Sequence, residues 1–398
     1  MLLISDKQSE RTAWLGWVAL FLVTAAIIMA GSSRSVVSAY RTAALSWFAG
    51  QGLYDGSGVG GFVYFPQAAI LFAPFAMIPQ TMGEVFWRLV NLGVFALGLR
   101  GFALLGQERS GRSLFPLMTL VTLPLAWDCA RNGQATLIMA GFMLLAVADI
   151  ARCRWWRAVL WLSLSVAIKP LAIVLVLLIM AIDRPMTWRL LLGMAAVALS
   201  PFLTQGPAYV LQQYAAFLQN STTAAHVGVV VHGWTSPFSA IKLIGVELTE
   251  QVQMAIRIFA AFGTLALCFL VRRRYDENRS AIYVYTLAAL YLILFSPRTE
   301  NNTYAMLGPS IGVFLSLAFL TEKRFGQGIF LTILTVVMIN SRPIGKVLTP
   351  HTEISWVSPL MAACFAAYLF FRLYTEPAKG ADKQTIAGPT AASDTPDI

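Results

Sequence analysis

Residues 157–183 read RAVLWLSLSVAIKPLAIVLVLLIMAID, and this stretch decides the fold. It is apolar almost throughout, but Lys169 and Pro170 stand in its middle. Each arm of about twelve residues makes roughly 18 Å of helix, which is short of the ~30 Å hydrocarbon core of a bilayer. Because basic residues flank both ends and proline disfavours helix at the residue before it, we predict a broken hairpin over residues 157–182.

This hairpin would place Lys169 at its tip, inside the protein. A membrane lysine often extends its ammonium group from a lipid-facing helix end to the interface, which is the ordinary structural explanation. In the middle of an apolar stretch and beside a break, a buried lysine with a functional role is the better interpretation.

The rest of the chain is just as apolar. Of its 398 residues, 58% are hydrophobic and 12% charged, and the mean hydropathy is +0.68. Soluble domains carry about 25% charged residues, so this chain lacks the polar side chains to cover a water-facing surface. Apolar runs this long exclude barrel strands and predict an all-α, polytopic transmembrane helical bundle. We expect one integral membrane domain, residues 1–375, and a disordered cytoplasmic tail, residues 376–398.

The basic residues mark one side of the membrane. The net charge is +10, and most of the basic residues occupy short turns between apolar runs, as in cytoplasmic loops, which argues against a nucleic-acid partner. These turns are Gln107–Arg112, Arg152–Arg157, Asp183–Arg189, Arg272–Arg279 and Glu322–Arg324. Lys7 and Arg11 precede the first apolar run. We therefore predict a multi-pass protein of the inner (plasma) membrane with both termini in the cytoplasm.

The longer connecting segments are predicted to lie outside. They are residues 31–61, 127–134, 205–250, 296–302 and 341–355. The apolar segment Phe62–Pro79 contains three prolines, and a full crossing there would invert every later loop. We expect a short or partly inserted helix that returns into the run Val85–Leu105.

Two outer turns are dense in polar residues: WDCARNGQ at 127–134 and SPRTENNTY at 296–304. Their ordinary explanations are a capped turn, with Asp128 paired to Arg131, and a helix-ending proline followed by an N-cap. Both turns fall on the same face as the hairpin tip. Lys169, Arg131 and Arg298 are therefore predicted to form a cationic site for a phosphate at the membrane surface.

Neither cysteines nor histidines predict a metal site. The four cysteines are scattered without metal or redox spacing, and the three histidines have no ligand spacing either. These residues are Cys129, Cys153, Cys268, Cys364, His226, His232 and His351. We expect no metal or other cofactor; His232, in a long outer loop, is a candidate for shaping a substrate pocket, although solvated loop histidines are commoner.

Short motifs on the predicted outer face occur in a fixed order along most of the chain. They are Tyr40-Arg41-Thr42-Ala43-Ala44, Gly50-Gln51-Gly52-Leu53-Tyr54, Phe62-Val63-Tyr64-Phe65-Pro66, Gly133-Gln134, Lys169-Pro170 and Ser296-Pro297. Together they resemble family 87 of the GT-C glycosyltransferases (DUF2029), which includes polyprenyl-phosphomannose-dependent α-mannosyltransferases. The resemblance implies a GT-C bundle with about 10–13 membrane helices, periplasmic loops and juxtamembrane helices.

The resemblance also implies a reaction. A glycosyl unit, mannose among the family's examples, would pass from a polyprenyl-phosphate donor to a lipid or glycan acceptor on the extracytoplasmic face. Lys169, with Arg131 and Arg298, would bind the donor phosphate. The substrate-binding residues expected from these motifs are Tyr40, Tyr54, Tyr64, Asn132, Gln134, Asn301, Asn302, Tyr304 and His232.

The family base is normally an aspartate a few residues before the tyrosine of the first motif, but Ser32–Ala39 contains no carboxylate. Asp55, Asp128 and Glu300 are the alternatives by location. The missing aspartate also fits a catalytically inactive relative that acts as a partner. A transporter or flippase of lipid-linked glycans is a further alternative, although the chain shows no convincing internal repeat.

Overall fold

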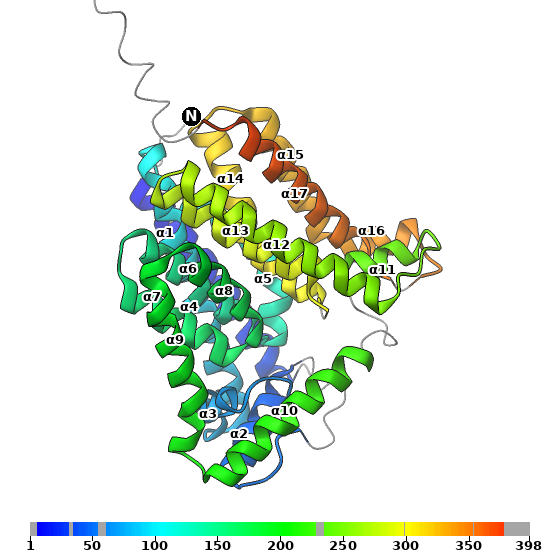
Figure 1. The fold of residues 1–398 in the computed structure, drawn as a ribbon. Coiled ribbons are helices and arrows are strands. Elements are labelled where there is room, and N and C mark those ends of the chain that lie inside the picture. The colour runs from blue at the N-terminus through cyan, green and yellow to red at the C-terminus, as the bar shows by residue number, and fades with distance from the viewer. Residues whose placement is uncertain are drawn as a thin grey trace, which may run out of the picture.

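A computed structural model describes residues 6–31, 35–54, 61–227, 235–297, 299–352 and 354–377, which contain helices and no strand (Figure 1). Within these ranges, seven helices are long and apolar enough to cross a membrane. They are α1 (Asp6–Met29), α4 (Gln80–Ser110), α9 with η2 (Arg184–Leu203), α12 (Glu250–Arg274), α13 (Glu277–Phe295), η3 with α14 (Asn301–Leu320) and α17 (Val357–Thr375). The predicted all-α polytopic bundle is confirmed.

The long helices differ in burial. The apolar window of η3 and α14 is 89% buried inside the protein, whereas those of α9 and α12 are each 17% buried. The former therefore lies at the centre of the bundle, and the latter two present apolar side chains to the surroundings. The remaining helices of the bundle are α5 (Phe115–Asn132), α6 (Thr136–Ala151), α7 (Trp155–Ile168), η1 (Pro170–Ala172), α8 (Ile173–Ile182), α15 (Phe325–Ile339) and α16 (Ser341–Leu348).

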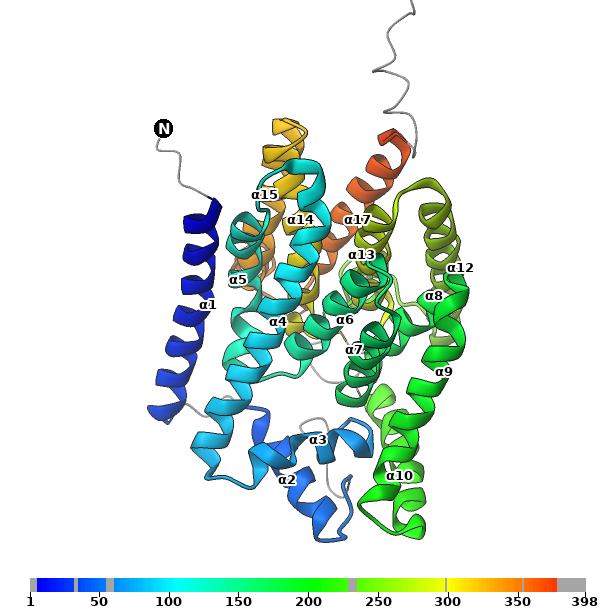
Figure 2. The same ribbon diagram turned by 90° about the vertical axis from the view of Figure 1, so that its left-hand side faces the viewer.

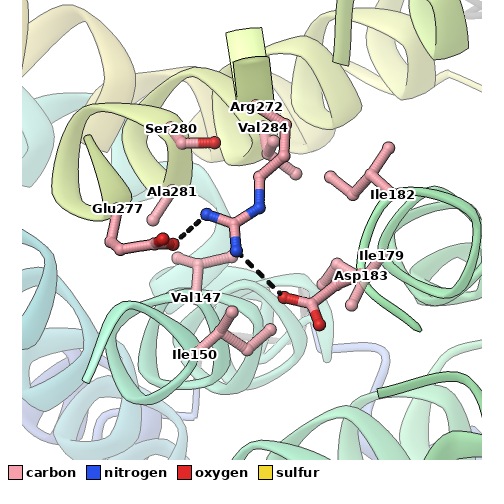
Figure 3. A pocket seen from close by; sticks show the side chains of 10 residues that line it. All are labelled: Val147, Ile150, Ile179, Ile182, Asp183, Arg272, Glu277, Ser280, Ala281 and Val284. Carbon is pink, nitrogen blue, oxygen red and sulfur yellow. Dashed lines mark hydrogen bonds and ion pairs between the residues drawn. The ribbon is translucent and has the colours of Figure 1, made fainter. Parts of the chain in front are cut away.

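The chain breaks between α7 and α8 at Lys169, whose backbone is extended (φ −145°, ψ 116°). Near the start of α7, Arg157 lies 3.2 Å from Asp149 at the end of α6. At the end of α8, Asp183 lines a small pocket together with Val147 and Ile150 of α6 (Figure 3). Both arms therefore finish at the same end of the bundle, with Lys169 at the other.

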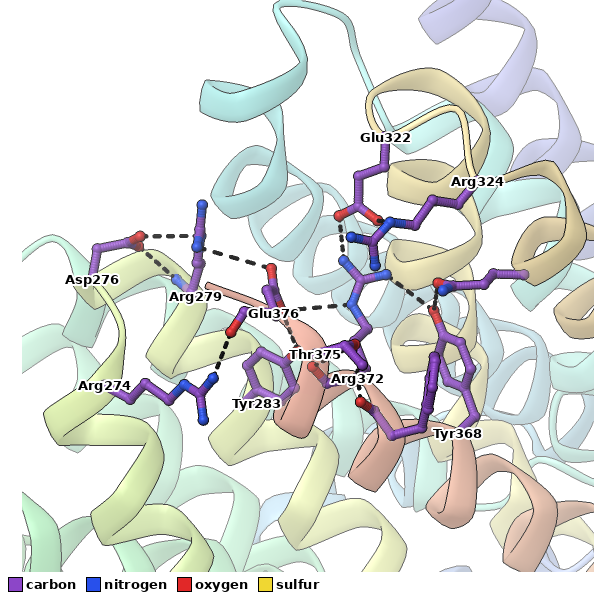
Figure 4. A network of polar contacts seen from close by, with 12 residues as sticks. Arg274, Asp276, Arg279, Tyr283, Glu322, Arg324, Tyr368, Arg372, Thr375 and Glu376 are labelled. Carbon is purple, nitrogen blue, oxygen red and sulfur yellow. Dashed lines mark hydrogen bonds and ion pairs between the residues drawn. The ribbon is translucent and has the colours of Figure 1, made fainter. Parts of the chain in front are cut away.

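The end of the bundle opposite Lys169 is held by a buried ionic network (Figure 4). Arg372 of α17, 1% exposed, pairs with Glu322 and lies 3.6 Å from Glu376. Glu376 also accepts a hydrogen bond from Tyr283 and lies 3.9 Å from Arg279. Glu376 was predicted to begin a disordered tail; it is instead 4% exposed and joins the bundle. The tail from residue 378 onward lies outside the described residues.

This end gathers several of the predicted cytoplasmic turns. Arg272 pairs with Glu277 and lies 3.6 Å from Asp183, which joins two of the basic turns across the bundle (Figure 3). The start of α1 and the end of α17 lie at this end as well (Figure 2).

Three helices form a separate layer at the opposite end: α2 (Val37–Phe48), α3 (Pro66–Ala76) and α10 (Pro207–Val227) (Figure 2). The indole of Trp47 donates to Thr204 at 3.0 Å, and the backbone N–H of Leu53 donates to Gln213 at 3.0 Å. Two of the segments predicted to be outer, 31–61 and 205–250, thus pack on one another. A further short helix, α11 (Pro237–Lys242), lies in the predicted outer segment 205–250.

Candidate functional site

The turn between α5 and α6 is built around Gly133. Its φ of +67° is left-handed and closes α5. A Cβ at this position would lie 2.5 Å from Cγ2 of Val37 and 3.1 Å from Cζ of Arg88. Both the backbone angle and the space therefore require glycine. The residue that follows the turn is Gln134.

Three side chains of α4 donate hydrogen bonds to backbone carbonyls of this turn. Trp87 donates from its indole to the carbonyl of Gly133 at 2.7 Å, and Asn91 donates to the carbonyl of Gln134 at 2.8 Å. Arg88 is 1% exposed and donates to the carbonyl of Arg131 at 2.9 Å, so it satisfies a carbonyl that the end of a helix leaves without an intrahelical donor.

These contacts of α4 were not predicted from the sequence. Glu84, Arg88 and Asn91 recur at helical spacing within an apolar run, which places them on one face of α4. Glu84 pairs with Arg88 at 3.3 Å. Polar residues at i, i+4 and i+7 in a membrane helix are the signal that would have pointed to a buried polar contact.

Gln134 joins the turn to Glu300. Its side-chain N–H donates to the Glu300 carboxylate at 2.7 Å. Glu300 caps η3: its carboxylate accepts from the backbone of Thr303, and its own backbone N–H donates to the Thr303 hydroxyl at 3.3 Å. A carboxylate has about four lone-pair positions, so Glu300 retains capacity to accept a further proton or hydrogen bond.

Lys169 reaches the first residue of α6. Its ammonium group donates to the hydroxyl of Thr136 at 2.8 Å. In the described part of the chain no carboxylate forms an ion pair with Lys169. The N-terminus of a helix carries a partial positive charge, so Lys169 and α6 present positive potential at the same place. One N–H group of this first turn, that of Ile138, already donates to the Asn91 side chain at 2.6 Å. This combination suits an anion such as a phosphate.

Tyr40 and Tyr64 stand beside the same turn. Their hydroxyls share a 3.1 Å hydrogen bond, and the N–H of Ala135 donates to Tyr40 at 3.4 Å. Burial raises the pKa of Tyr40 well above its ordinary value, helped by Tyr64 and by the negative charge of Glu300. Tyr40 is therefore a neutral phenol that can donate a hydrogen bond.

An apolar cavity of roughly 170 Å³ opens next to these residues. Tyr40, Tyr64, Trp87 and Ile138 line it, and so does Ile168, the residue before Lys169. The lysine and the start of α6 thus lie at the border between a polar cluster and an aromatic-lined apolar space.

Some predicted site residues are engaged in structural contacts. Asp128 is 38% exposed and lies 3.6 Å from Arg342 of α16. It is not paired with Arg131, the partner expected for a capped turn.

The hydroxyl of Tyr54 donates to the carbonyl of Tyr64 at 2.6 Å. Tyr304 donates to the carbonyl of Thr235 at 2.9 Å, which joins η3 to the segment before α11. Asn301 accepts from the hydroxyl of Ser358 on α17.

Other predicted residues lie close to the turn. Arg131 is in the last turn of α5, and its Nε is buried without a hydrogen-bond partner among the described residues. The carbonyl of Asn132 accepts from Val36 at 3.0 Å. The carbonyl of Asn302 accepts from the Cys129 thiol at 2.9 Å. Asp55, Arg298 and His232 lie outside the described residues.

No group of three potential metal ligands occurs among the residues that the structure describes. The roles assigned to the site residues, and the expectation of no cofactor, stay predictions.

The family model of glycosyltransferase family 87 matches residues 62–297, which is more than half of the chain. The matched region includes the Gly133 turn and Lys169; Tyr40 precedes it and Glu300 follows it. No curated protein was found to match the chain.

Proposed function

The chain belongs to glycosyltransferase family 87, and on that premise we propose that it transfers a sugar from a polyprenyl-phosphate donor to a hydroxyl of a lipid or glycan acceptor. Its family makes it a glycosyltransferase, and its seven apolar helices make it a multi-pass membrane protein. The donor, the acceptor and the side of the membrane are what the proposal adds.

The observation that carries the proposal is the position of Lys169. Its ammonium group lies at the N-terminus of α6, and no carboxylate of the described residues pairs with it. An uncompensated cation at a helix N-terminus favours a phosphate group. The adjoining apolar cavity, bounded by Ile168 and aromatic side chains, provides a surface for the first isoprene units of the donor.

Glu300 is the favoured base among the three carboxylates considered. It lies one hydrogen bond from Gln134, two residues before the threonine that Lys169 binds. Asp128 is turned toward Arg342 instead. A carboxylate beside the donor-phosphate site is placed to accept a proton from an incoming hydroxyl.

The reaction then proceeds as a single displacement. The acceptor oxygen attacks the anomeric carbon and forms the new glycosidic bond, while its proton passes to Glu300. The bond between the anomeric carbon and the phosphate oxygen breaks, and the electron pair stays with the phosphate. Lys169 and the α6 N-terminus stabilise the added negative charge, and the configuration of the anomeric carbon inverts.

The proposed side of the membrane follows from charge. The basic turns gather at the end opposite Lys169, and such turns normally stay in the cytoplasm. This orientation puts the candidate site and the layer of α2, α3 and α10 on the extracytoplasmic face of the plasma membrane.

The test is transfer by the purified full-length protein, with labelled polyprenyl-phosphate sugars as donors and a membrane lipid extract as acceptor. Lys169→Met is expected to lose transfer, because removing one donor from a preorganised anion site costs roughly 10²–10³-fold in rate. The matched control is Lys346→Met, an exposed lysine of α16. Movement of lipid between vesicle leaflets without transfer would favour a flippase, and no reaction with any donor would favour an inactive relative.

A further inference from the structure

A second cavity lies at the end of the bundle opposite Lys169, between α4, α6 and α7. Its volume is roughly 330 Å³. Four arginines line it: Arg100 from α4, Arg152 and Arg154 from the turn after α6, and Arg157 from α7. The glycosyl-transfer chemistry proposed above uses none of them.

The carboxylates at this cavity do not balance the arginines. Asp149, 5% exposed, lies 3.2 Å from Arg157 and 3.8 Å from Arg154, and it also accepts from the indole of Trp161 at 2.9 Å. Arg100 pairs with Glu10 of α1 at 3.5 Å. No carboxylate with a described side chain pairs with Arg152. Among the described side chains, two carboxylates thus pair with three of the four guanidinium groups, and that of Arg152 has no carboxylate partner.

The rest of the cavity wall is apolar. Leu97, Leu145 and Ala148 line it, and Leu97 is 54% exposed on the outer surface of α4. Gly101 also lines the cavity, and a Cβ there would stay 3.7 Å from Leu145 and Ala148. The cavity therefore joins a cationic end to an apolar wall, of which Leu97 faces the surroundings of the bundle.

We propose that this cavity binds a phosphate ester, namely the headgroup of an anionic phospholipid in the leaflet away from the candidate active site. Guanidinium groups bind phosphate oxygens in pairs, and basic pockets between membrane helices are suited to anionic headgroups. Arg100, Arg154 and Arg157 are 43%, 52% and 56% exposed, as topogenic arginines are, but they also border a cavity with an apolar wall. The site stands independently of the glycosyl-transfer proposal.

The test is native mass spectrometry of the full-length protein in non-ionic detergent, titrated with phosphatidylglycerol, phosphatidylcholine or inorganic phosphate. The protein is expected to retain phosphatidylglycerol more tightly than phosphatidylcholine. Arg152→Gln/Arg154→Gln should weaken this binding about 25-fold, a factor of roughly five per arginine, while Arg157 and Trp161 still satisfy Asp149.

Two further variants complete the test: a control with the same charge change outside the cavity, and a single substitution inside it. Arg184→Gln/Arg273→Gln removes the same charge from exposed positions at the same end and should leave binding unchanged. Arg152→Gln alone disturbs no ion pair of the described residues and should weaken binding about fivefold. Equal phosphatidylglycerol binding by the pocket variants and the protein without substitutions would overturn the site, and displacement by millimolar inorganic phosphate would overturn its assignment to a lipid.

Discussion

Gly133→Ala is expected to uncouple the Gly133 turn from the candidate site. The left-handed backbone costs a non-glycine residue about 1–2 kcal/mol. The added Cβ would also lie 2.5 Å from Val37, and such overpacking costs about 1–3 kcal/mol. The two effects together predict a loss of roughly 2–5 kcal/mol in the free energy of unfolding.

Gly111→Ala is a matched control for the backbone contribution. Gly111 has a φ of +62°, but nothing lies within 4 Å of a Cβ placed there. This variant should lose only the backbone contribution of about 1–2 kcal/mol, so the difference between the two glycines isolates the steric contribution of Val37 and Arg88. Adding Val37→Ala to Gly133→Ala should recover part of that difference, which a double-mutant cycle measures as coupling.

We expect the transfer activity to depend on the geometry of the Gly133 turn and not on the stability of the whole protein. Because Gln134 and Glu300 are joined through this turn, a displacement of about 1 Å is expected to lower transfer by roughly 10²-fold. Gly111→Ala should keep its activity. The measurements are denaturant-induced unfolding in detergent micelles and the rate of sugar transfer. Equal stability and equal activity of the two variants would refute the claim that Gly133 positions the site.

Two other predictions concern Arg372 and Tyr40. Arg372→Met removes the buried cation that Glu322 and Glu376 share, so it should cost about 3–5 kcal/mol of unfolding free energy. The exposed Arg273→Met should cost little, and similar values for the two variants would contradict the ionic network. Burial raises the pKa of Tyr40, so above pH about 10 the unfolded chain loses this phenol proton while the folded chain keeps it, and stability falls as pH rises. Tyr40→Phe should make that fall smaller in unfolding measured from pH 9 to 11; an unchanged slope would contradict the buried, protonated phenol.

The sequence predicted the features that arise from local chemistry. Pro170 restricts the backbone of Lys169, so the break between α7 and α8 could be predicted from two adjacent residues. The short helix after Phe65 follows in the same way from its prolines. Net positive charge in short turns likewise indicated which turns share one end of the bundle.

Contacts between segments distant in the sequence could not be predicted in this way. The hydrogen bonds from Trp87, Arg88 and Asn91 form because α4 packs beside the α5–α6 turn. Arg342 meets Asp128 only because α16 bends 74° from α15, and the sequence gives no register between those helices. Pairing of this kind depends on the tertiary arrangement.

The central claim is that Lys169 binds the donor phosphate while Glu300 removes the acceptor proton. The most direct measurement is donor affinity and single-turnover transfer of Glu300→Gln, with Asp128→Asn as the control. We predict that Glu300→Gln binds the polyprenyl-phosphate sugar as tightly as the unchanged protein but transfers about 10²–10⁴-fold more slowly, and that Asp128→Asn transfers normally. Transfer by Glu300→Gln at the unchanged rate, or loss of transfer in Asp128→Asn instead, would contradict the account.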